Sequence, residues 1–163
     1  MKKKGTVWLV ILVVAVVGYF AYQSFSPKSV DDMIYAAYGK SGDAGNGVMK
    51  LENVNPDYSR TIWYLTFKSD AQSPTAQVGS NLFSIPRVKR LFSAKDAESF
   101  MICYCYRLEG GGHDKILMAT IDRNQYEKII ADSSYNSDYF YRYVTLVDAD
   151  KSLFPDLQQY IIE

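Results

Sequence analysis

The feature that most constrains this chain is an uncharged apolar segment close to its N-terminus. Residues Gly5 to Pro27 carry no charged side chain, and their central part is nearly unbroken in Val, Leu, Ile, Trp and Ala. As a helix, these 23 residues span roughly 34 Å at about 1.5 Å per residue. That length is enough to cross a hydrocarbon core of about 30 Å. The sequence therefore predicts one transmembrane helix over residues 5–27.

The charges that flank this segment predict its orientation. Lys2, Lys3 and Lys4 precede the segment, whereas Lys28 and then Asp31 and Asp32 follow it. The positive-inside rule then places residues 1–4 in the cytoplasm as a basic tail and exports residues 28–163. We expect a single-pass protein of the bacterial cytoplasmic (inner) membrane whose C-terminal domain is periplasmic or extracellular. A cleaved signal peptide is the alternative, but the bulky aromatic residues before Pro27 make a poor cleavage site.

The composition of the chain bounds what residues 28–163 can be. The chain holds 14 Tyr, 8 Phe and 2 Trp, which is far more aromatic surface than a disordered segment carries. Its 18 basic and 18 acidic residues balance, so no basic footprint for nucleic acid is present. We expect one folded domain that contacts the lipid bilayer through residues 5–27 and another envelope protein through its surface. The sequence leaves the oligomeric state open.

Several segments of this domain have clear local patterns. Ser29 followed by Asp32 predicts a helix N-terminus, and Gly39 predicts the end of that helix. Apolar and polar residues alternate from Arg60 to Lys68, which predicts a strand. The most distinct pattern is a hairpin, in which β-rich runs at Ser99–Leu108 and Lys115–Asp122 flank a glycine-rich turn. A helix with Tyr126, Ile129 and Ile130 on one face is predicted to begin at Asn124.

The remaining segments give weaker patterns. Residues Ser69–Asn81 contain Pro74 and Gly79 and have neither period, so they predict a long loop. Pro86 restricts Leu82–Phe92 to a short edge strand. Two further predictions are a strand over Tyr139–Val147 and a last short helix capped by Ser152. Together these segments predict an α+β fold, in which a mainly antiparallel sheet carries a few helices packed on one face.

Two groups of residues are candidates for a binding surface. In the predicted strand near the C-terminus, alternation places Tyr139, Tyr141 and Tyr143 on one face, and tyrosine is favoured at protein interfaces. The alternative is ordinary packing of this row within the sheet. The second group is a basic cluster around residues 87–95, which would suit lipid phosphates, an anionic glycan or an acidic partner. Its alternative is a charged edge strand that discourages aggregation. The cluster comprises Arg87, Lys89, Arg90 and Lys95.

Other reactive residue types give no strong motif. Cys103 and Cys105 share a strand face, a spacing that suits neither a relaxed disulfide nor a Cys-x-x-Cys turn. We predict two buried free thiols, with a metal or redox pair as the alternative. His113 follows three glycines, whose mobility is unfavourable for a catalytic triad. Asp148 and Asp150 match the first and third ligand positions of a calcium-binding loop, but Leu153 occupies the position that needs glycine. We therefore predict no metal site and no cofactor.

These observations favour a binding protein over an enzyme. The first hypothesis is a membrane-tethered, extracytoplasmic protein-binding domain, acting as an accessory subunit of an envelope assembly or as an inhibitor or immunity-type protein. The alternative is an envelope enzyme, a hydrolase, whose catalytic groups meet only in the fold. Tethering would raise the effective concentration of the domain near other membrane proteins, which favours the first hypothesis physically.

Overall fold

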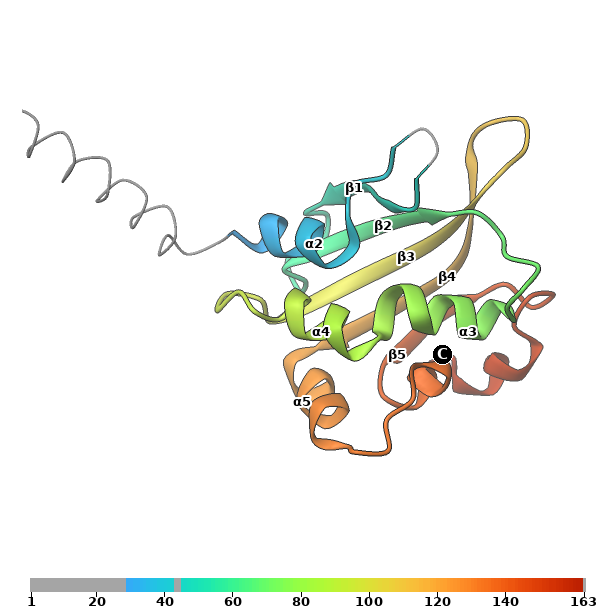
Figure 1. Ribbon diagram of the computed structural model, residues 1–163. Coiled ribbons are helices and arrows are strands. Elements are labelled where there is room, and N and C mark those ends of the chain that lie inside the picture. The colour runs from blue at the N-terminus through green and yellow to red at the C-terminus, as the bar shows by residue number, and fades with distance from the viewer. Residues whose placement is uncertain (1–28, 43–44, 163) are drawn as a thin grey trace, which may run out of the picture.

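The computed structural model describes residues 29–42 and 45–162 (Figure 1). The predicted basic tail and the predicted transmembrane helix lie outside the described residues. Within the described part of the chain, no helix is both long and apolar enough to span a bilayer.

The fold is α+β and is built on one mixed sheet of five strands in the order β1-β2-β3-β4-β5. Three strand pairs are antiparallel, whereas β2 and β3 run parallel. A parallel pair needs a crossover connection, and the helical segment at residues 74–91 supplies it. The strands are β1 (Gly47–Glu52), β2 (Arg60–Thr66), β3 (Ser99–Arg107), β4 (His113–Asp122) and β5 (Thr145–Ala149).

Helices cover one face of the sheet, as Figure 1 shows for α2, α3 and α4. The core lies between this helical layer and the sheet. The stacked rings of Tyr64 and Tyr104, 5.5 Å apart, lie at its centre. The helices are α2 (Val30–Tyr38), α3 (Pro74–Val78), the π-helical turn η1 (Gly79–Phe83), α4 (Ile85–Leu91), α5 (Arg123–Ala131) and the 3₁₀ helices η2 (Ser137–Arg142) and η3 (Pro155–Tyr160).

The segments with clear local signals fold as predicted. Ser29 and Asp32 form a reciprocal capping box at the start of α2, and Gly39 ends that helix with φ of 72°. The predicted strand at 60–68 is β2, and the predicted hairpin is β3 and β4. The capping box and the hairpin turn are local signals, because each depends on only a few neighbouring residues.

The predicted loop at 69–81 and the predicted edge strand at 82–92 are both wrong, because these residues form α3, η1 and α4. Pro74 and Pro86 lie in the first turns of α3 and α4, where proline removes no helical hydrogen bond. The apolar residues of this segment face the sheet and are fully buried. They are Val78, Leu82, Phe83, Val88 and Leu91.

The predictions near the C-terminus also need correction. Residues 137–142 form the 3₁₀ helix η2, and the strand begins only at Thr145. The Asn136 side chain accepts a hydrogen bond from the backbone of Asp138 and caps η2, a local competitor of strand pairing. Ser152 does not cap the last helix. Instead, the carboxylate of Asp150 accepts the Ser152 N–H at 2.8 Å in a turn before η3.

Candidate binding surfaces

The tyrosines of η2 and η3 form one cluster on the surface. Tyr139 and Tyr141 come from η2, and their ring centroids lie 6.3 Å apart at an interplanar angle of 75°. Tyr160, from η3, brings its ring to 4.8 Å from that of Tyr141. The guanidinium carbon of Arg142 lies 5.0 Å from the centroid of the Tyr139 ring and 5.9 Å from that of Tyr141. We call these four residues the tyrosine–arginine patch.

Three members of the tyrosine–arginine patch are exposed, Tyr141 is partly buried against the core, and the tyrosine hydroxyls carry no structural role among the described residues. Tyr139 is 48% exposed and Tyr160 is 40% exposed. No hydrogen bond joins the hydroxyl of either residue, or that of Tyr141, to another described residue. Four other tyrosines, three buried and one partly buried, differ because their hydroxyls bond inside the fold: Tyr38 with Leu82, Tyr104 with Asn81, Tyr106 with Gln77 and the partly buried Tyr135 with Phe83.

The third tyrosine of the predicted row, Tyr143, faces a different environment. Its hydroxyl donates a short hydrogen bond to a carboxylate oxygen of Asp132. Its ring packs edge-on against Tyr135, with centroids 5.0 Å apart. Two side-chain hydrogen bonds hold the pKa of Asp132 below its usual range: the one from Ser134 has the larger effect, and the one from Tyr143 the smaller. The structure therefore brings Tyr139 and Tyr141 together and gives Tyr143 a part in joining η2 to the end of α5.

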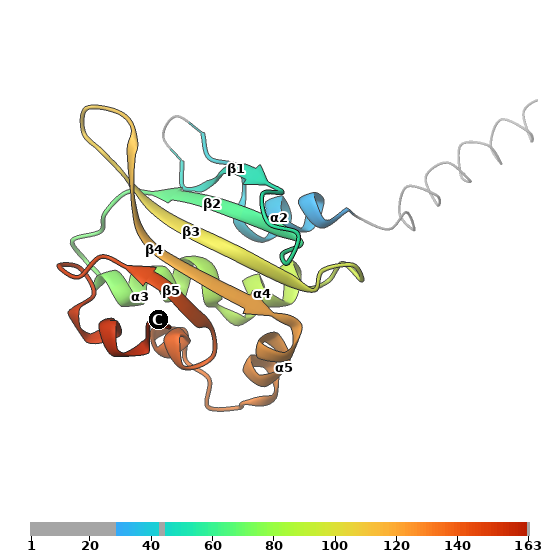
Figure 2. The same ribbon diagram turned by 180° about the vertical axis from the view of Figure 1, so that it is seen from behind.

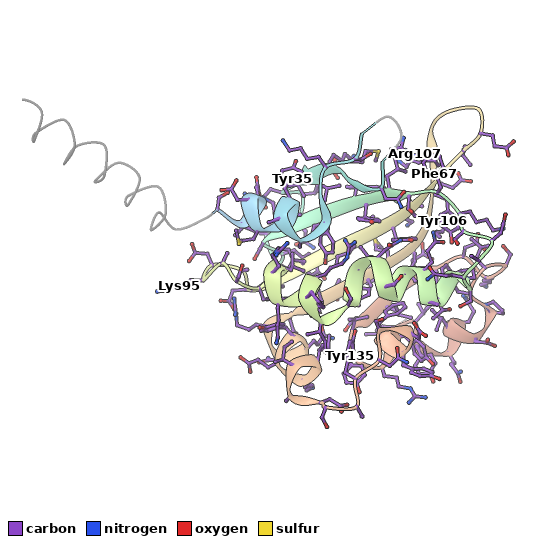
Figure 3. All side chains as sticks on the ribbon, viewed as in Figure 1. Tyr35, Phe67, Lys95, Tyr106, Arg107 and Tyr135 are labelled. Carbon is purple, nitrogen blue, oxygen red and sulfur yellow. The ribbon has the colours of Figure 1, made fainter. Side chains whose placement is uncertain are left out.

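The predicted basic cluster lies on α4 and the following turn, not on an edge strand. Arg87 donates to the carbonyl of Ala37 at 3.3 Å, and Arg90 donates to that of Ala36 at 3.0 Å. Both carbonyls belong to the last turn of α2, where intrahelical partners are missing. Two of the cluster's side chains thus fasten α4 to α2. Lys89 is exposed, and Lys95 lies on the turn after α4 (Figure 3).

A second candidate surface is the face of the sheet that none of the described helices covers (Figure 2). The register of the strands places one residue from each strand in a row across this face. We call it the central row. Ion pairs occupy both ends of the row, because Lys50 binds Glu52 at 2.7 Å and Lys115 binds Asp148 at 2.9 Å. The central row is Lys50, Trp63, Cys103, Met118 and Asp148.

The two cysteines lie in the middle of this uncovered face and are free. Cys103 is 2% exposed and Cys105 is fully buried, which confirms the prediction of buried free thiols. Burial raises the pKa of both thiols, that of Cys105 to about 12, while Lys115 and Lys50 act in the opposite direction. The thiols are therefore protonated at neutral pH and are poor nucleophiles in this state.

Neither edge strand of the sheet is fully open. At β1, the backbone N–H of Val48 donates to Gly39, and its carbonyl accepts from Ser41. At β5, the carbonyl of Leu146 accepts from the N–H of Ile162 at 3.1 Å. The chain therefore occupies part of each edge itself, which protects the sheet from pairing with other strands. A partner has more room on the uncovered face or on the tyrosine–arginine patch than along a strand edge.

One hollow of about 520 Å³ lies between the residues that lead into α3, at 68–75, and the turn before η3, at 152–156. It is open to solvent, and its lining is about equally polar and apolar. His113 lies at the start of β4, exposed, with its ring 6.2 Å from that of Trp63.

The carboxyl groups of Glu52, Asp132 and Asp150 have pKa values below their usual range, each mainly through a side-chain hydrogen bond. A lowered pKa is the reverse of what a general acid needs at neutral pH.

Sequence reasoning did not identify Arg142 and Tyr160 as members of the tyrosine–arginine patch. Tyr160 lies far from Tyr141 in sequence, so no local period connects the two residues. Arg142 stood in a predicted strand, and only the helical turn of η2 brings it over the rings. The sequence shows several tyrosine and arginine residues close together near the C-terminus. It does not show how their side chains are arranged in space.

The fold and these surfaces define an α+β domain with a mixed five-stranded sheet, one uncovered sheet face and an exposed aromatic patch. Comparison with protein-family models, with curated proteins and with solved structures finds no significant match to this chain.

Proposed function

We propose that this chain is a membrane-tethered, extracytoplasmic protein-binding domain that uses the tyrosine–arginine patch to bind another envelope protein. In this proposal residues 5–27 anchor the chain in the bacterial cytoplasmic membrane, and the domain acts as an accessory subunit or an inhibitor. The anchor and its orientation rest on the apolar segment and the three lysines before it. The observation that carries the binding role is the surface cluster in which the exposed Tyr139, Arg142 and Tyr160 surround the partly buried Tyr141.

The chemistry of the patch suits a protein partner. Tyrosine offers a large ring with few rotatable bonds, so its contacts cost little conformational entropy on binding. Tyrosine and arginine are among the residue types that contribute most to interface energies. In this patch the rings already pack against one another, and Arg142 lies over two of them. The surface is therefore largely ordered before a partner arrives, which reduces the free-energy cost of association.

The free hydroxyls add specificity to this surface. The Tyr139 and Tyr160 hydroxyls have no hydrogen-bond partner among the described residues and can pair with a partner's backbone. A hydroxyl left unpaired in a buried interface costs about 1–3 kcal/mol, so a partner must supply matching groups. Acidic groups on the partner would also pair with Arg142, whose guanidinium is exposed.

Co-purification from membranes tests this proposal. The full chain, tagged at its C-terminus, is isolated from detergent-solubilised membranes as wild type and as a Tyr139→Ala, Tyr160→Ala variant. Loss of one hot-spot tyrosine costs about 2 kcal/mol, which is about a 30-fold weaker Kd. We expect the specific partner to disappear from the variant while the thermal midpoint changes little, because both side chains are exposed.

A matched control is Tyr58→Ala, which removes a partly buried tyrosine from the connection between β1 and β2. This control should retain the partner. Equal recovery of the same proteins by the wild type and by the Tyr139→Ala, Tyr160→Ala variant would refute binding through the patch.

A further inference from the structure

Sulfur side chains gather on the uncovered face of the sheet. The described residues contain six methionines and cysteines, and four of them lie on this face. Along β3, residues 100, 102, 104 and 106 belong to the core, so the alternate residues point to the uncovered side. On β4, Leu117 and Ala119 belong to the core, which places the residue between them on the same uncovered side. The four are Met101, Cys103, Cys105 and Met118.

Three of these side chains are neighbours on this face. Met118 lies directly opposite Cys103 in the register of β3 and β4, and side chains in such pairs have Cβ atoms about 4.5–5.5 Å apart. The Sγ atom of Cys105 lies 3.9 Å from the carbonyl oxygen of Cys103, so this thiol leans back along the strand toward Cys103. The strand register and this contact therefore place two thiols and one thioether next to one another on this face.

The neighbours of these sulfurs are also suited to an ion. On the β2 side, Trp63 is paired with Cys103, and its indole nitrogen donates to Glu52 at 2.6 Å, which fixes the ring. Lys50 lies over that ring at 4.6 Å. Lys115 lies opposite Cys105. A complex of two thiolates with one monovalent cation carries a net negative charge. The two ammonium groups attract this charge, although each is already paired with a carboxylate, that of Glu52 or of Asp148.

We propose that Cys103, Cys105 and Met118 bind one soft monovalent cation, Cu(I), on the uncovered sheet face. Thiolate and thioether ligands select Cu(I) over harder ions. Structural Zn(II) sites use four protein ligands, and no group of three His, Cys, Asp or Glu side chains suited to a metal occurs in the described part of the chain. On binding, each thiol loses its proton to solvent and forms a sulfur–copper bond, so two protons are released for each ion bound.

The sequence alone did not predict this site, because Met118 and Cys103 lie on different strands of the hairpin and are far apart in the chain. A bulge in the pairing of β3 with β4, after Tyr104, also shifts the register next to the pair. The proposal is independent of the tyrosine–arginine patch, which lies on η2 and η3. It assigns the two buried cysteines a ligand in place of the metal-free role that the sequence predicted.

Titration with copper tests the site. The full chain, purified in detergent under anaerobic reducing conditions, is titrated with Cu(I) in competition with a chromogenic Cu(I) chelator. Ag(I), which has no accessible redox chemistry here, serves as a second probe. We expect one Cu(I) per chain, an ultraviolet sulfur-to-copper charge-transfer band and release of two protons. Absence of 1:1 binding by the wild type, or Zn(II) displacing Cu(I), would overturn the proposal.

Two variants assign the ligands. Cys103→Ser should abolish the charge-transfer band and weaken Cu(I) binding by about a hundredfold or more. Met118→Leu keeps the volume of a partly exposed side chain and so preserves the fold, yet it should weaken binding by about tenfold. Met33→Leu, which changes a thioether under the helical layer, should leave binding unchanged. If Met118→Leu binds Cu(I) like the wild type, the proposed ligand set is wrong, whatever the folding of Cys103→Ser.

Discussion

Replacing Gly79 with alanine tests how the patch-bearing helix η2 is held against the core. Gly79 begins η1, where its backbone is helical with φ of −56° and ψ of −52°. A Cβ atom built at this position would lie 2.0 Å from the carbonyl oxygen of Ser137, the first residue of η2. Contacts of a real Cβ are essentially never shorter than 3.0 Å. One of the two backbones must therefore move by roughly 1 Å, since no flexible side chain can yield.

The expected magnitude is the difference between two opposing effects. Overpacking a well-packed site costs about 1–3 kcal/mol, and the upper part of this range applies because the clash is with backbone. Alanine in a helix is favoured over glycine by about 1 kcal/mol, which offsets part of the cost. We expect a net loss of about 2 kcal/mol in the free energy of unfolding. For a domain of this size, that loss lowers the thermal midpoint by about 6–10 °C.

Thermal unfolding of the full chain, followed by circular dichroism, measures this change. Gly110→Ala is the matched control, because a Cβ at Gly110 meets nothing within 4 Å. The control should leave the midpoint within about 2 °C of the wild type. If Gly79→Ala is as stable as the wild type or more stable, helix propensity decides the outcome and the proposed close contact between η1 and η2 is wrong.

Two further predictions concern pH and the membrane. Burial raises the pKa values of Tyr38, Tyr104 and Tyr135, so their stabilisation is complete below about pH 10, where unfolded tyrosine titrates, and falls above it. The last part of the tyrosinate absorption should therefore appear only together with loss of near-ultraviolet circular dichroism; complete ionisation of the tyrosines in a still native protein would contradict this. Alkaline carbonate washing should leave the full chain in the membrane pellet, and its release would exclude the proposed anchor over residues 5–27.

The sequence predicted those elements whose signals are local. A capping box at Ser29 and a glycine turn between two β-rich runs each specify a structure within a few residues, and both occur as expected. The helical crossover was missed because Pro74 and Pro86 resemble helix breakers, although proline in a first helical turn costs nothing. Tertiary burial of the intervening apolar residues then decides the conformation, and a single sequence does not show that burial.

The candidate site was predictable in composition and not in geometry. Tyr139 and Tyr141 were expected to share a face, and they do lie together, although on a 3₁₀ helix and not on a strand. Tyr143 is drawn away by its bond to Asp132. Arg87 and Arg90 were candidates because they are charged, yet both donate to the exposed carbonyls at the end of α2. These hydrogen bonds form only because the fold places α4 beside the end of α2, and the sequence alone does not show which helices are neighbours.

The measurement that tests the central claim most directly is site-specific photo-cross-linking in intact cells. A photoreactive phenylalanine analogue replaces Tyr139 of the full chain, and in a separate strain it replaces Val54, which is 73% exposed on the β1–β2 connection. Binding through the tyrosine–arginine patch predicts one discrete adduct from position 139 and none from position 54. Adducts of equal yield from both positions, or none from position 139, would contradict it.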